Sequence, residues 1–364
     1  MNTNMNMMEL PIVNNKIISK ALTYKSFSSP LIYKSVELPV DMKPTEMLIK
    51  VKAASFNPID ILLKNFCPQH FGNEDKGIGN EFAGVVVNSG QSAKFNKGDN
   101  IYGASLLPFT PVGTFSEYYI LDTKKALVFN KIPKGMGFSE AAALPIATGT
   151  AFTCLDQYHG NLKGKNVLIL GAGTSIGMNT IQFAKKFYKT DKIVATCSEN
   201  SASKVQSLGA DLTVDYKKGE TFKVNSVKKF VEAHGLFDVV IDCVRDNSLF
   251  DVTDDVIKNQ SEGGIFVRVT RPRIINDGES RFAHWQPALR LFKYKWGARF
   301  GYHAKFSEVL FEKNNSFGDR VEMLWNENNF KPVIDRECNA FTEFQQAFDA
   351  VASGKTDGRV VCTF

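Results

Sequence analysis

Asn166-Val-Leu-Ile-Leu170, followed directly by Gly171-Ala-Gly-Thr-Ser-Ile-Gly177, is the stretch that decides the fold. The first five residues include an uninterrupted apolar run, which is typical of a strand buried on both faces of a parallel sheet. Glycines let the backbone approach a pyrophosphate, and free N–H groups at the start of a helix face its negative charge. With a helix expected over 178–188, the stretch predicts the strand, loop and helix of a dinucleotide site.

The loop departs from the commonest glycine pattern. Its spacing is G-x-G-x-x-x-G, and Thr174-Ser175 stands where small glycines would be expected. The two hydroxyl groups would either hydrogen-bond a phosphate or weaken the site through their bulk, and the sequence leaves both readings open. Turns between a strand and a helix often contain glycines without binding anything, but here the elements on both sides favour coenzyme binding.

Apolar runs and helical segments alternate after this loop. Strands are expected at Ile193 to Cys197, Phe237 to Asp242 and Gly264 to Val269, with a helix over 202–208 after the first of them. This alternation is typical of a doubly wound parallel sheet, so the segment 148–310 is predicted to be an α/β domain of the Rossmann type.

The end of the second strand bears on the choice of coenzyme. A site that prefers NAD usually has Asp or Glu there, which accepts the ribose hydroxyls. Here Thr196-Cys197-Ser198 is uncharged, and Lys204 and Lys217-Lys218 follow. This pattern favours the 2′-phosphate of NADPH, with NADH as the less favoured alternative because Glu199 would also reach the ribose.

The residues before this domain show a different pattern. Glu46 to Ala53 alternates apolar and polar residues, segments 81–87 and 113–120 are similar, and turn signals separate them. We expect a β-rich domain over 16–147, after a flexible tail over 1–15. A helix over 341–351 and a final strand over 358–363 are expected in the C-terminal part, 311–364.

Composition limits the classes of function. The chain has 364 residues, 43% hydrophobic and 23% charged, which suits two globular domains. A net charge of +6 is too small to favour nucleic-acid binding. The six cysteines include no pair with the C-x-x-C spacing of a zinc site or redox motif, which favours buried thiols in a reducing compartment. The first residues lack the features of a secretory or mitochondrial leader, and no apolar run reaches the ~20 residues of a membrane-spanning helix.

Short motifs occur in a fixed order along nearly the whole chain. They are Asn57-Pro-Ile-Asp60, Gly79-Asn-Glu-Phe-Ala-Gly-Val-Val86, Lys97-Gly-Asp-Asn-Ile-Tyr-Gly103, Gly113-Thr-Phe-Ser-Glu-Tyr118, Ala141-Ala-Ala-Leu-Pro145, Gly149-Thr-Ala-Phe152, Leu208-Gly-Ala-Asp211 and Gly358-Arg-Val-Val361. With the phosphate loop, they resemble the medium-chain dehydrogenase/reductase superfamily, specifically its quinone-oxidoreductase-like branch and, within it, fungal proteins of the Yim1 and Ast type. The resemblance implies a GroES-like catalytic domain built from 16–147 and 311–364, with the Rossmann domain between them and the active site in the cleft.

The resemblance also bears on metal. Zinc-dependent members carry Cys, a Gly-His-Glu and a further Cys as ligands, and here those places read Pro58-Ile59, Gly79-Asn80-Glu81 and the region of Ile146. An amide in place of the imidazole, with no thiolate in either cysteine position, predicts that no zinc is bound. Polarisation of a carbonyl would then come from hydrogen-bond donors.

Carried over by position, the resemblance implies a set of site residues. Asn57 and Asp60 would line the cleft beside the nicotinamide, although Asn57 is equally a turn residue before Pro58 and Asp60 equally a helix cap. Thr150 would contact the ribose or amide of that ring. The coenzyme-binding residues would be Thr150, the loop residues Gly171, Gly173, Thr174, Ser175, Ile176 and Gly177, then Ser198, Lys204 and Tyr216 at the 2′-phosphate and Cys243 and Val244 at the adenosine side. Arg245 stands where relatives usually have glycine.

A basic, aromatic insertion is expected near 271–306. Aromatic and cationic residues interleave over 281–302, which would suit either contact with a membrane or lipid-droplet surface or a helix packed on its own domain.

The first functional hypothesis is a zinc-independent, NADPH-dependent oxidoreductase of quinone-like or α,β-unsaturated carbonyls, acting on a small lipophilic substrate. The alternative is a catalytically idle member of the fold that serves as a peripheral membrane or lipid-droplet adaptor. A monomer or homodimer is expected in the cytoplasm, with lipid droplets or the mitochondrial surface as peripheral locations.

Overall fold

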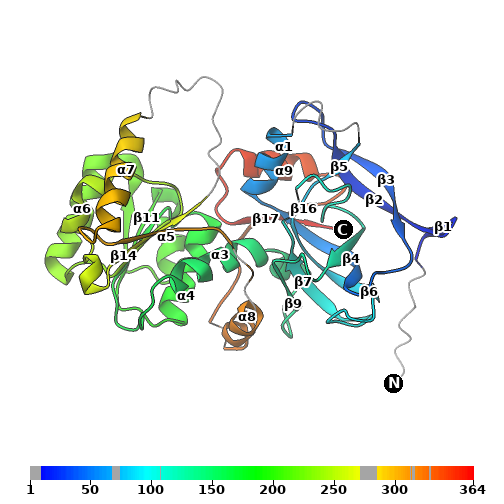
Figure 1. Ribbon diagram of the computed structural model, residues 1–364, viewed down its shortest axis with the longest axis horizontal. Helices are drawn as coiled ribbons and strands as arrows, with labels where there is room; N and C mark the ends of the chain where they lie inside the picture. The colour runs from blue at the N-terminus through cyan, green and yellow to red at the C-terminus, as the bar shows by residue number, and fades with distance from the viewer. Residues whose placement is uncertain are drawn as a thin grey trace.

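The computed structural model describes residues 10–67, 74–106, 108–270, 285–311, 313, 316–327 and 329–364, with the backbone alone for 285–288. Two lobes lie side by side, and the long helix α3 (Pro145–Asp156) runs between them (Figure 1). One lobe holds a parallel sheet covered by helices. The other holds the antiparallel strands from the first part of the chain together with the last strand.

The Rossmann lobe is built on a six-stranded parallel sheet. Its strand order is β12 (Leu212–Asp215), β11 (Ile193–Cys197), β10 (Val167–Leu170), β13 (Val239–Asp242), β14 (Ile265–Val269) and β15 (Lys305–Val309). β10, the first of these strands along the chain, lies in the middle of the sheet, and later strands are added first on one side of it and then on the other. Doubly wound sheets bind their ligands at this point, where the strand order reverses. Every residue of β10 is buried, as its continuous apolar run predicts.

Helices connect these parallel strands. They are α4 (Ser175–Lys186), α5 (Glu199–Ser207), α6 (Glu220–His234) and α7 (Trp285–Arg299), with the short 3₁₀ segments η1 (Tyr216–Lys218), η2 (Phe250–Asp255) and η3 (Gln260–Glu262).

The GroES-like lobe is built from both ends of the chain. Its larger sheet has the order β16 (Ile334–Asn339), β17 (Arg359–Thr363), β4 (Glu46–Phe56), β6 (Glu81–Ser89), β7 (Asn100–Ala104) and β9 (Val128–Lys131), and β8 (Tyr118–Asp122) pairs with β4. β17 pairs antiparallel with β4, so Val360 lies opposite Phe56. The last strand of the chain therefore completes a sheet that begins near its start.

A smaller sheet and four helices complete this part of the described structure. The sheet contains β1 (Ile12–Val13), β2 (Lys16–Tyr24), β3 (Ile32–Pro39) and β5 (Lys76–Gly77), and the helices are α1 (Pro58–Asn65), α2 (Phe138–Ala142), α8 (Phe317–Asn326) and α9 (Phe344–Ala352). Residues 1–9 of the expected tail lie outside the described residues. Ile12 pairs with Ile17, so the end of that segment forms a β-hairpin.

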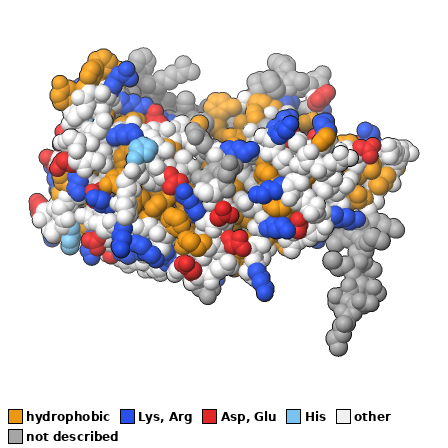
Figure 2. Space-filling model, turned by 60° about the horizontal axis from the view of Figure 1, so that its bottom comes forward, with side chains coloured by type: hydrophobic (Ala, Val, Ile, Leu, Met, Phe, Trp, Pro, Cys, Tyr) orange, Lys and Arg blue, Asp and Glu red, His pale blue; other side chains and the backbone are white. Residues whose placement is uncertain are grey.

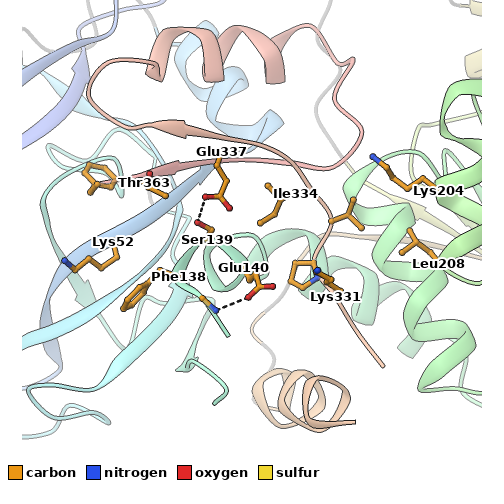
Figure 3. Close-up of a pocket in the computed structure, with 14 residues that line it drawn as sticks. Lys52, Phe138, Ser139, Glu140, Lys204, Leu208, Lys331, Ile334, Glu337 and Thr363 are labelled. Atoms are coloured by element: carbon orange, nitrogen blue, oxygen red, sulfur yellow. Dashed lines mark hydrogen bonds between the residues drawn. The ribbon is translucent and has the colours of Figure 1, made fainter. Parts of the chain in front are cut away.

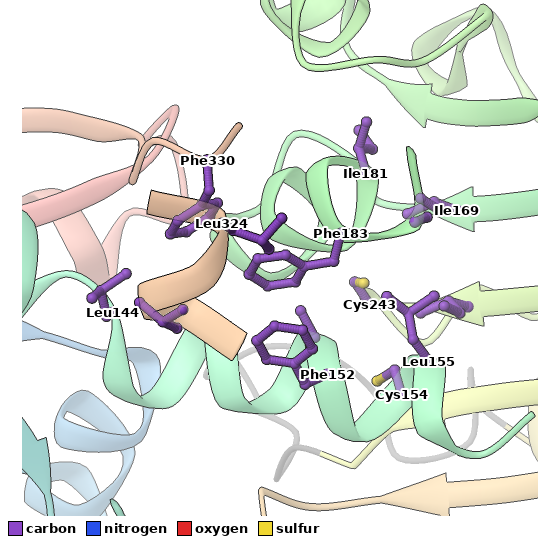
Figure 4. Close-up of a cluster of buried hydrophobic side chains, with 14 of the residues drawn as sticks. Leu144, Phe152, Cys154, Leu155, Ile169, Ile181, Phe183, Cys243, Leu324 and Phe330 are labelled. Atoms are coloured by element: carbon purple, nitrogen blue, oxygen red, sulfur yellow. The ribbon is translucent and has the colours of Figure 1, made fainter. Parts of the chain in front are cut away.

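One hydrophobic cluster joins the two lobes. Phe152 of α3 stacks on Phe183 of α4 with ring centroids 4.0 Å apart, and Phe330 contacts Phe183 at 4.9 Å (Figure 4). The same cluster extends to Ala53 of β4 and Val361 of β17. Because close-packed side chains resist relative movement, this core fixes α3 against the phosphate-loop helix.

The structure bears on two further expectations, which concern disulfides and membrane-spanning helices. All six cysteines lie in the described segments and are buried, and none of them forms a disulfide. Among the helices of the described segments, none combines the length and apolarity needed to cross a membrane. Of the expected basic insertion, 271–284 lies outside the described residues, and α7 follows it.

Candidate coenzyme site and active site

The phosphate loop closes through hydrogen bonds within itself. The Thr174 hydroxyl accepts the N–H of Gly177 at 3.1 Å and donates to the carbonyl of Gly171 at 2.8 Å. Thr174 thereby caps α4, which begins at Ser175. The hydroxyl that looked anomalous in the sequence is a helix cap, so its bulk is accommodated by the turn.

Two glycines of the loop are required by its geometry. Gly171 has φ 78°, in the left-handed region, and a Cβ there would lie 2.3 Å from the Val244 side chain. A Cβ on Gly177 would lie 2.6 Å from the backbone of Ala172. At Gly173 a Cβ would lie 3.3 Å from the Ser201 hydroxyl, which places the start of α5 against the loop.

The loop leaves donors available for an anion. Within the described residues, the N–H groups of Gly173, Ser175 and Ile176 have no acceptor in the protein. Unpaired N–H groups at a helix start, together with the positive end of the helix dipole, bind phosphate. These donors and the close glycine packing fit a coenzyme pyrophosphate.

The expected 2′-phosphate residues separate into two groups. Ser198 contacts Ser201 through hydroxyl oxygens 3.0 Å apart, and the Lys204 ammonium donates to the carbonyl of Asp357 at 3.0 Å. Tyr216 lies in η1 and is 48% exposed, and no described hydrogen bond joins it to the others. Asp357 was not among the sequence-predicted residues; it comes from the loop before β17, on the other lobe.

The loop after β13 forms the other side of the phosphate loop. Cys243 is buried, and Val244 packs on Gly171. Arg245 has φ 62°, a left-handed conformation that explains why a glycine is favoured at this position. The Asp242 carboxylate accepts the N–H groups of Val244 and Asp246, at 3.0 Å each, and thereby shapes the turn.

A buried ion pair supports that turn. Arg268 of β14 donates from Nε to Asp242 at 2.8 Å, and its Nη2 donates to the Asp246 carbonyl. Burial raises the pKa of Asp242, while the Arg268 charge opposes this effect. Neither residue was predicted from the sequence, and only the strand register, which places Asp242 opposite Arg268, identifies the pair.

In the GroES-like lobe, Asn57 and Asp60 stand at the start of α1. The N–H of Asn57 donates to Asp60 Oδ2 at 2.6 Å, which is the helix-capping arrangement. The amide of Asn80 donates to the other carboxylate oxygen at 2.5 Å. Both predicted residues are almost fully buried, at 2% and 1% exposure.

The Glu81–Arg359 ion pair, which was not predicted from the sequence, binds the side chain of Asn57. Glu81 pairs with Arg359, and its Oε1 accepts the amide of Asn57 at 2.8 Å. Arg359 donates to Asn57 Oδ1 at 2.8 Å and to the Ser55 hydroxyl at 2.7 Å. We call Ser55, Asn57, Asp60, Asn80, Glu81 and Arg359 the Glu81–Arg359 network.

Burial within the network shifts the pKa values of Asp60 and Arg359. Burial raises the pKa of Asp60 to about 6, although hydrogen bonds from Asn57 and Asn80 and the charge of Arg359 oppose this. Burial lowers the pKa of Arg359 to about 10, and the negative charge of Asp60 acts in the opposite direction. The guanidinium therefore remains protonated at neutral pH and Glu81 keeps its counter-ion.

The network is connected to the coenzyme side through α3. Glu81 Oε2 accepts the N–H of Ile146 at the start of this helix, at 2.9 Å. Thr150, one turn later, donates its hydroxyl to the Ile146 carbonyl at 2.7 Å. A Cβ on Gly149 would lie 2.1 Å from the ring of Phe311, so that ring covers the helix beside Thr150. Phe311 is a further candidate that sequence reasoning missed.

These side chains do not suit zinc. Asn80 donates its amide to Asp60, and Pro58 and Ile146 offer no side-chain ligand. In the part of the chain that the structure describes, no three or more His, Cys, Asp or Glu side chains are grouped to hold a metal ion.

A large hollow lies elsewhere between the lobes. It measures about 930 Å³, and Lys52, Glu337, Lys331 and Lys204 are among the residues of the two lobes that line it (Figure 3). The Ser139 hydroxyl donates to Glu337 across its wall at 3.0 Å. Of the predicted site residues only Lys204 lines it, so we place the chemistry at the phosphate loop and the Glu81–Arg359 network instead.

The fold and the loop define a Rossmann-type dinucleotide-binding protein with a GroES-like partner lobe. Family models match both parts: residues 43–134 match the alcohol dehydrogenase GroES-like domain, and 208–362 match the zinc-binding dehydrogenase family. The chain belongs to the medium-chain dehydrogenase/reductase superfamily. This confirms the resemblance and the α/β architecture expected from the sequence.

Relatives and solved structures agree with this placement. The chain is 29% identical to Protein YIM1-2 of Lachancea thermotolerans over 325 residues, covering 86% of this chain and 88% of that protein. It is 27% identical to Protein YIM1 of Saccharomyces cerevisiae over 337 residues, with 86% and 88% covered. The quinone oxidoreductase from Coxiella burnetii shares the fold with a TM-score of 0.73 and 24% identity, over 95% of this chain and 99% of that one. The CurK enoyl reductase does so with a TM-score of 0.72 and 20% identity, over the same shares.

Proposed function

We propose that this protein is a zinc-independent, NADPH-dependent oxidoreductase that reduces quinone-like or α,β-unsaturated carbonyl acceptors. The observation that carries the proposal is the phosphate loop. Its N–H groups at Gly173, Ser175 and Ile176 have no acceptor among the described residues and can therefore donate to an anion. The Glu81–Arg359 network supports zinc independence, because the amide of Asn80 stands where zinc-dependent relatives have a histidine ligand and is hydrogen-bonded to Asp60. The shared fold with a quinone oxidoreductase and an enoyl reductase supports the class of acceptor.

The chain's own groups would position the reactants. The nicotinamide, when bound, supplies a hydride from C4, and solvent supplies the proton that completes the two-electron reduction. The loop would hold the pyrophosphate, and Glu81 would fix Asn57 on one side and the start of α3 on the other. A conjugated acceptor needs less polarisation than a simple ketone, so hydrogen-bond donors can replace a metal ion.

Binding and turnover should be measured separately. NADPH titrated against intrinsic fluorescence should saturate, with a tighter Kd than NADH. A panel of ortho-quinones and enones should then oxidise NADPH, at a rate unchanged by prior dialysis against a chelator. If NADPH binds but no acceptor is reduced, the reductase proposal is wrong. Loss of activity on chelation, with recovery on adding zinc, would contradict zinc independence alone.

An exposed aromatic row on α7 favours a second candidate, that of a peripheral adaptor on an anionic membrane or lipid-droplet surface. Phe292 and Trp296 of α7, and Phe300 directly after it, are 61%, 57% and 56% exposed. The ring centroids of Phe292 and Trp296 lie 6.1 Å apart and those of Trp296 and Phe300 5.3 Å apart, so the three form one row. Lys293 and Arg299 flank the row and have no ion-pair partner among the described residues. Hydrophobic and basic side chains project together from the upper end of this lobe (Figure 2). Aromatic side chains flanked by cations suit a lipid interface.

Vesicle flotation separates this candidate from simple helix packing. Protein should float with vesicles containing phosphatidylserine, and replacing Phe292, Trp296 and Phe300 together by Ser should abolish flotation. Phe66→Ser, at a 61% exposed position on the other lobe, is the matched control. Equal flotation of the triple variant and the control would remove the adaptor proposal. Mass measurement in solution before and after the triple substitution would also show whether the row joins two copies of the chain.

A further inference from the structure

A carboxylate from the GroES-like lobe reaches the end of the second Rossmann strand. Asp357 Oδ1 accepts the hydroxyl of Ser201 at 2.7 Å, and Ser201 in turn contacts Ser198. The main-chain carbonyl of Asp357 accepts the Lys204 ammonium at 3.0 Å. The side chain therefore sits on the group of residues expected to recognise the adenosine ribose.

Two further observations locate this carboxylate. Ser201 is also the residue that a Cβ on Gly173 would approach, so the Asp357 contact is adjacent to the phosphate loop. The pKa of Cys197, the last residue of β11, is raised to about 11 by burial and then by the charges of Asp215 and Asp357. Asp357 thus lies within electrostatic range of the strand end where an NAD-preferring site carries its acid.

Neighbouring groups hold the Asp357 loop in place. Its N–H donates to Asp335 at 3.1 Å, and Asp335 is paired with Arg336 at 2.8 Å. Gly358 has φ 140°, and a Cβ there would lie 2.7 Å from the Val333 carbonyl. The backbone of the loop is therefore confined, and it presents the Asp357 side chain to this subsite.

We propose that Asp357 determines coenzyme choice from the opposite lobe, because its carboxylate occupies the subsite that a 2′-phosphate would need. The inference rests on the proposed function only in requiring a dinucleotide at this loop. A 2′-phosphate must displace the carboxylate from Ser201, and like charges at hydrogen-bond range repel. NADH has a 2′-hydroxyl there, which can donate to the same carboxylate.

The consequence is a small coenzyme preference. Ser198 and Lys204 favour the phosphate and Asp357 opposes it, so the NADPH preference of the natural chain should be modest. Because Ser201 and Asp357 come from different lobes, displacement of the carboxylate also breaks a contact between them. Binding of NADPH, but not of NADH, therefore has to break that contact.

The test is the dissociation constant of each coenzyme for Asp357→Asn, measured by calorimetry at low and at high salt. NADPH should bind at least fivefold tighter than to the natural chain at low salt, with a smaller gain at high salt, where the repulsion is screened. NADH should bind equally or more weakly. Asp349→Asn makes the same charge change at an exposed position on α9 and should alter neither constant.

Two outcomes would overturn the inference. A parallel change for both coenzymes would show that Asp357 acts on the loop as a whole, and no change for NADPH would show that the carboxylate lies outside the phosphate subsite. Failure of the proposed function looks different, because neither coenzyme would then give heat with any variant. Denaturant unfolding of the variant establishes that it is folded when binding is measured.

Discussion

The phosphate loop and the Glu81–Arg359 network are built in opposite ways. The loop is made within seven consecutive residues, mainly by backbone and one capping hydroxyl, and its internal hydrogen bonds join positions three apart. The network is made by side chains, and its Arg359–Asn57 bond joins positions 302 apart. A local backbone site depends on glycine geometry, whereas a buried polar network depends on every partner being present. The two regions should therefore fail differently when altered.

The largest expected effect is on the network. Arg359→Met leaves Glu81 buried without its counter-ion, which should lower the free energy of unfolding by about 3–5 kcal/mol. Adding Glu81→Gln should restore part of that loss, since no uncompensated charge remains. Denaturant unfolding measures both variants. Arg336→Met, which breaks the exposed pair with Asp335, should cost less than about 1 kcal/mol. Equal losses at the two arginines would contradict the role given to burial.

The pH dependence of stability should also come from the network. Because burial raises the pKa of Asp60 from 3.8 to about 6, the folded state holds this proton more tightly than the unfolded state does. Its contribution is therefore complete below pH 4 and is lost as pH rises through 6, by ~3 kcal/mol in all. Asp60→Asn should flatten this part of the profile.

Unfolding free energies at several pH values from 4 to 7 measure that change. The exposed substitution Asp349→Asn should keep the natural slope. A slope for Asp60→Asn as steep as that of the natural chain would place the titration on another group.

The same contrast explains what could be predicted from the sequence. The strand, loop and helix around Gly171 were foreseeable because the apolar run and the glycines act locally. The network was not, because Glu81 and Arg359 each stand in an ordinary strand motif, and only the pairing of both β17 and β6 with β4 brings them together. Asn57 and Asp60 were selected by family resemblance, and the structure shows them tied into this ion pair.

One helix was also missed, for a related reason. α6 carries only Val227 and Phe230 as buried apolar residues, so its periodic pattern is weak. It is bounded by Gly219 and Gly235, both with positive φ, and it is stabilised by packing of its two buried apolar residues against the parallel sheet. Asp357 was missed because no local pattern shows that a loop from the other lobe reaches α5.

A smaller effect is expected from the backbone of the loop. Gly177→Ala places a Cβ 2.6 Å from the Ala172 backbone, so the loop must shift. We expect coenzyme affinity to fall at least ~10-fold and stability by about 1–3 kcal/mol. Gly137→Ala, where the new Cβ meets its nearest atom at 3.6 Å, should leave coenzyme affinity unchanged. Unaltered coenzyme affinity of the Gly177 variant would show that the coenzyme does not bind at this loop.

The smallest expected effect separates the cap from the helix that follows it. Thr174→Val removes the hydroxyl that accepts the Gly177 N–H and donates to Gly171, and loss of such a cap costs about 1 kcal/mol. Thr180→Val changes the same atoms six residues later, within α4, where the hydroxyl only donates back to the Ile176 carbonyl at 2.8 Å. That carbonyl keeps its main-chain partner, so the second variant should lose less stability. Coenzyme affinity should fall for Thr174→Val alone, since only the cap sets the direction of the free N–H groups. Equal losses of affinity would mean that α4 as a whole, rather than its first turn, orients the phosphate.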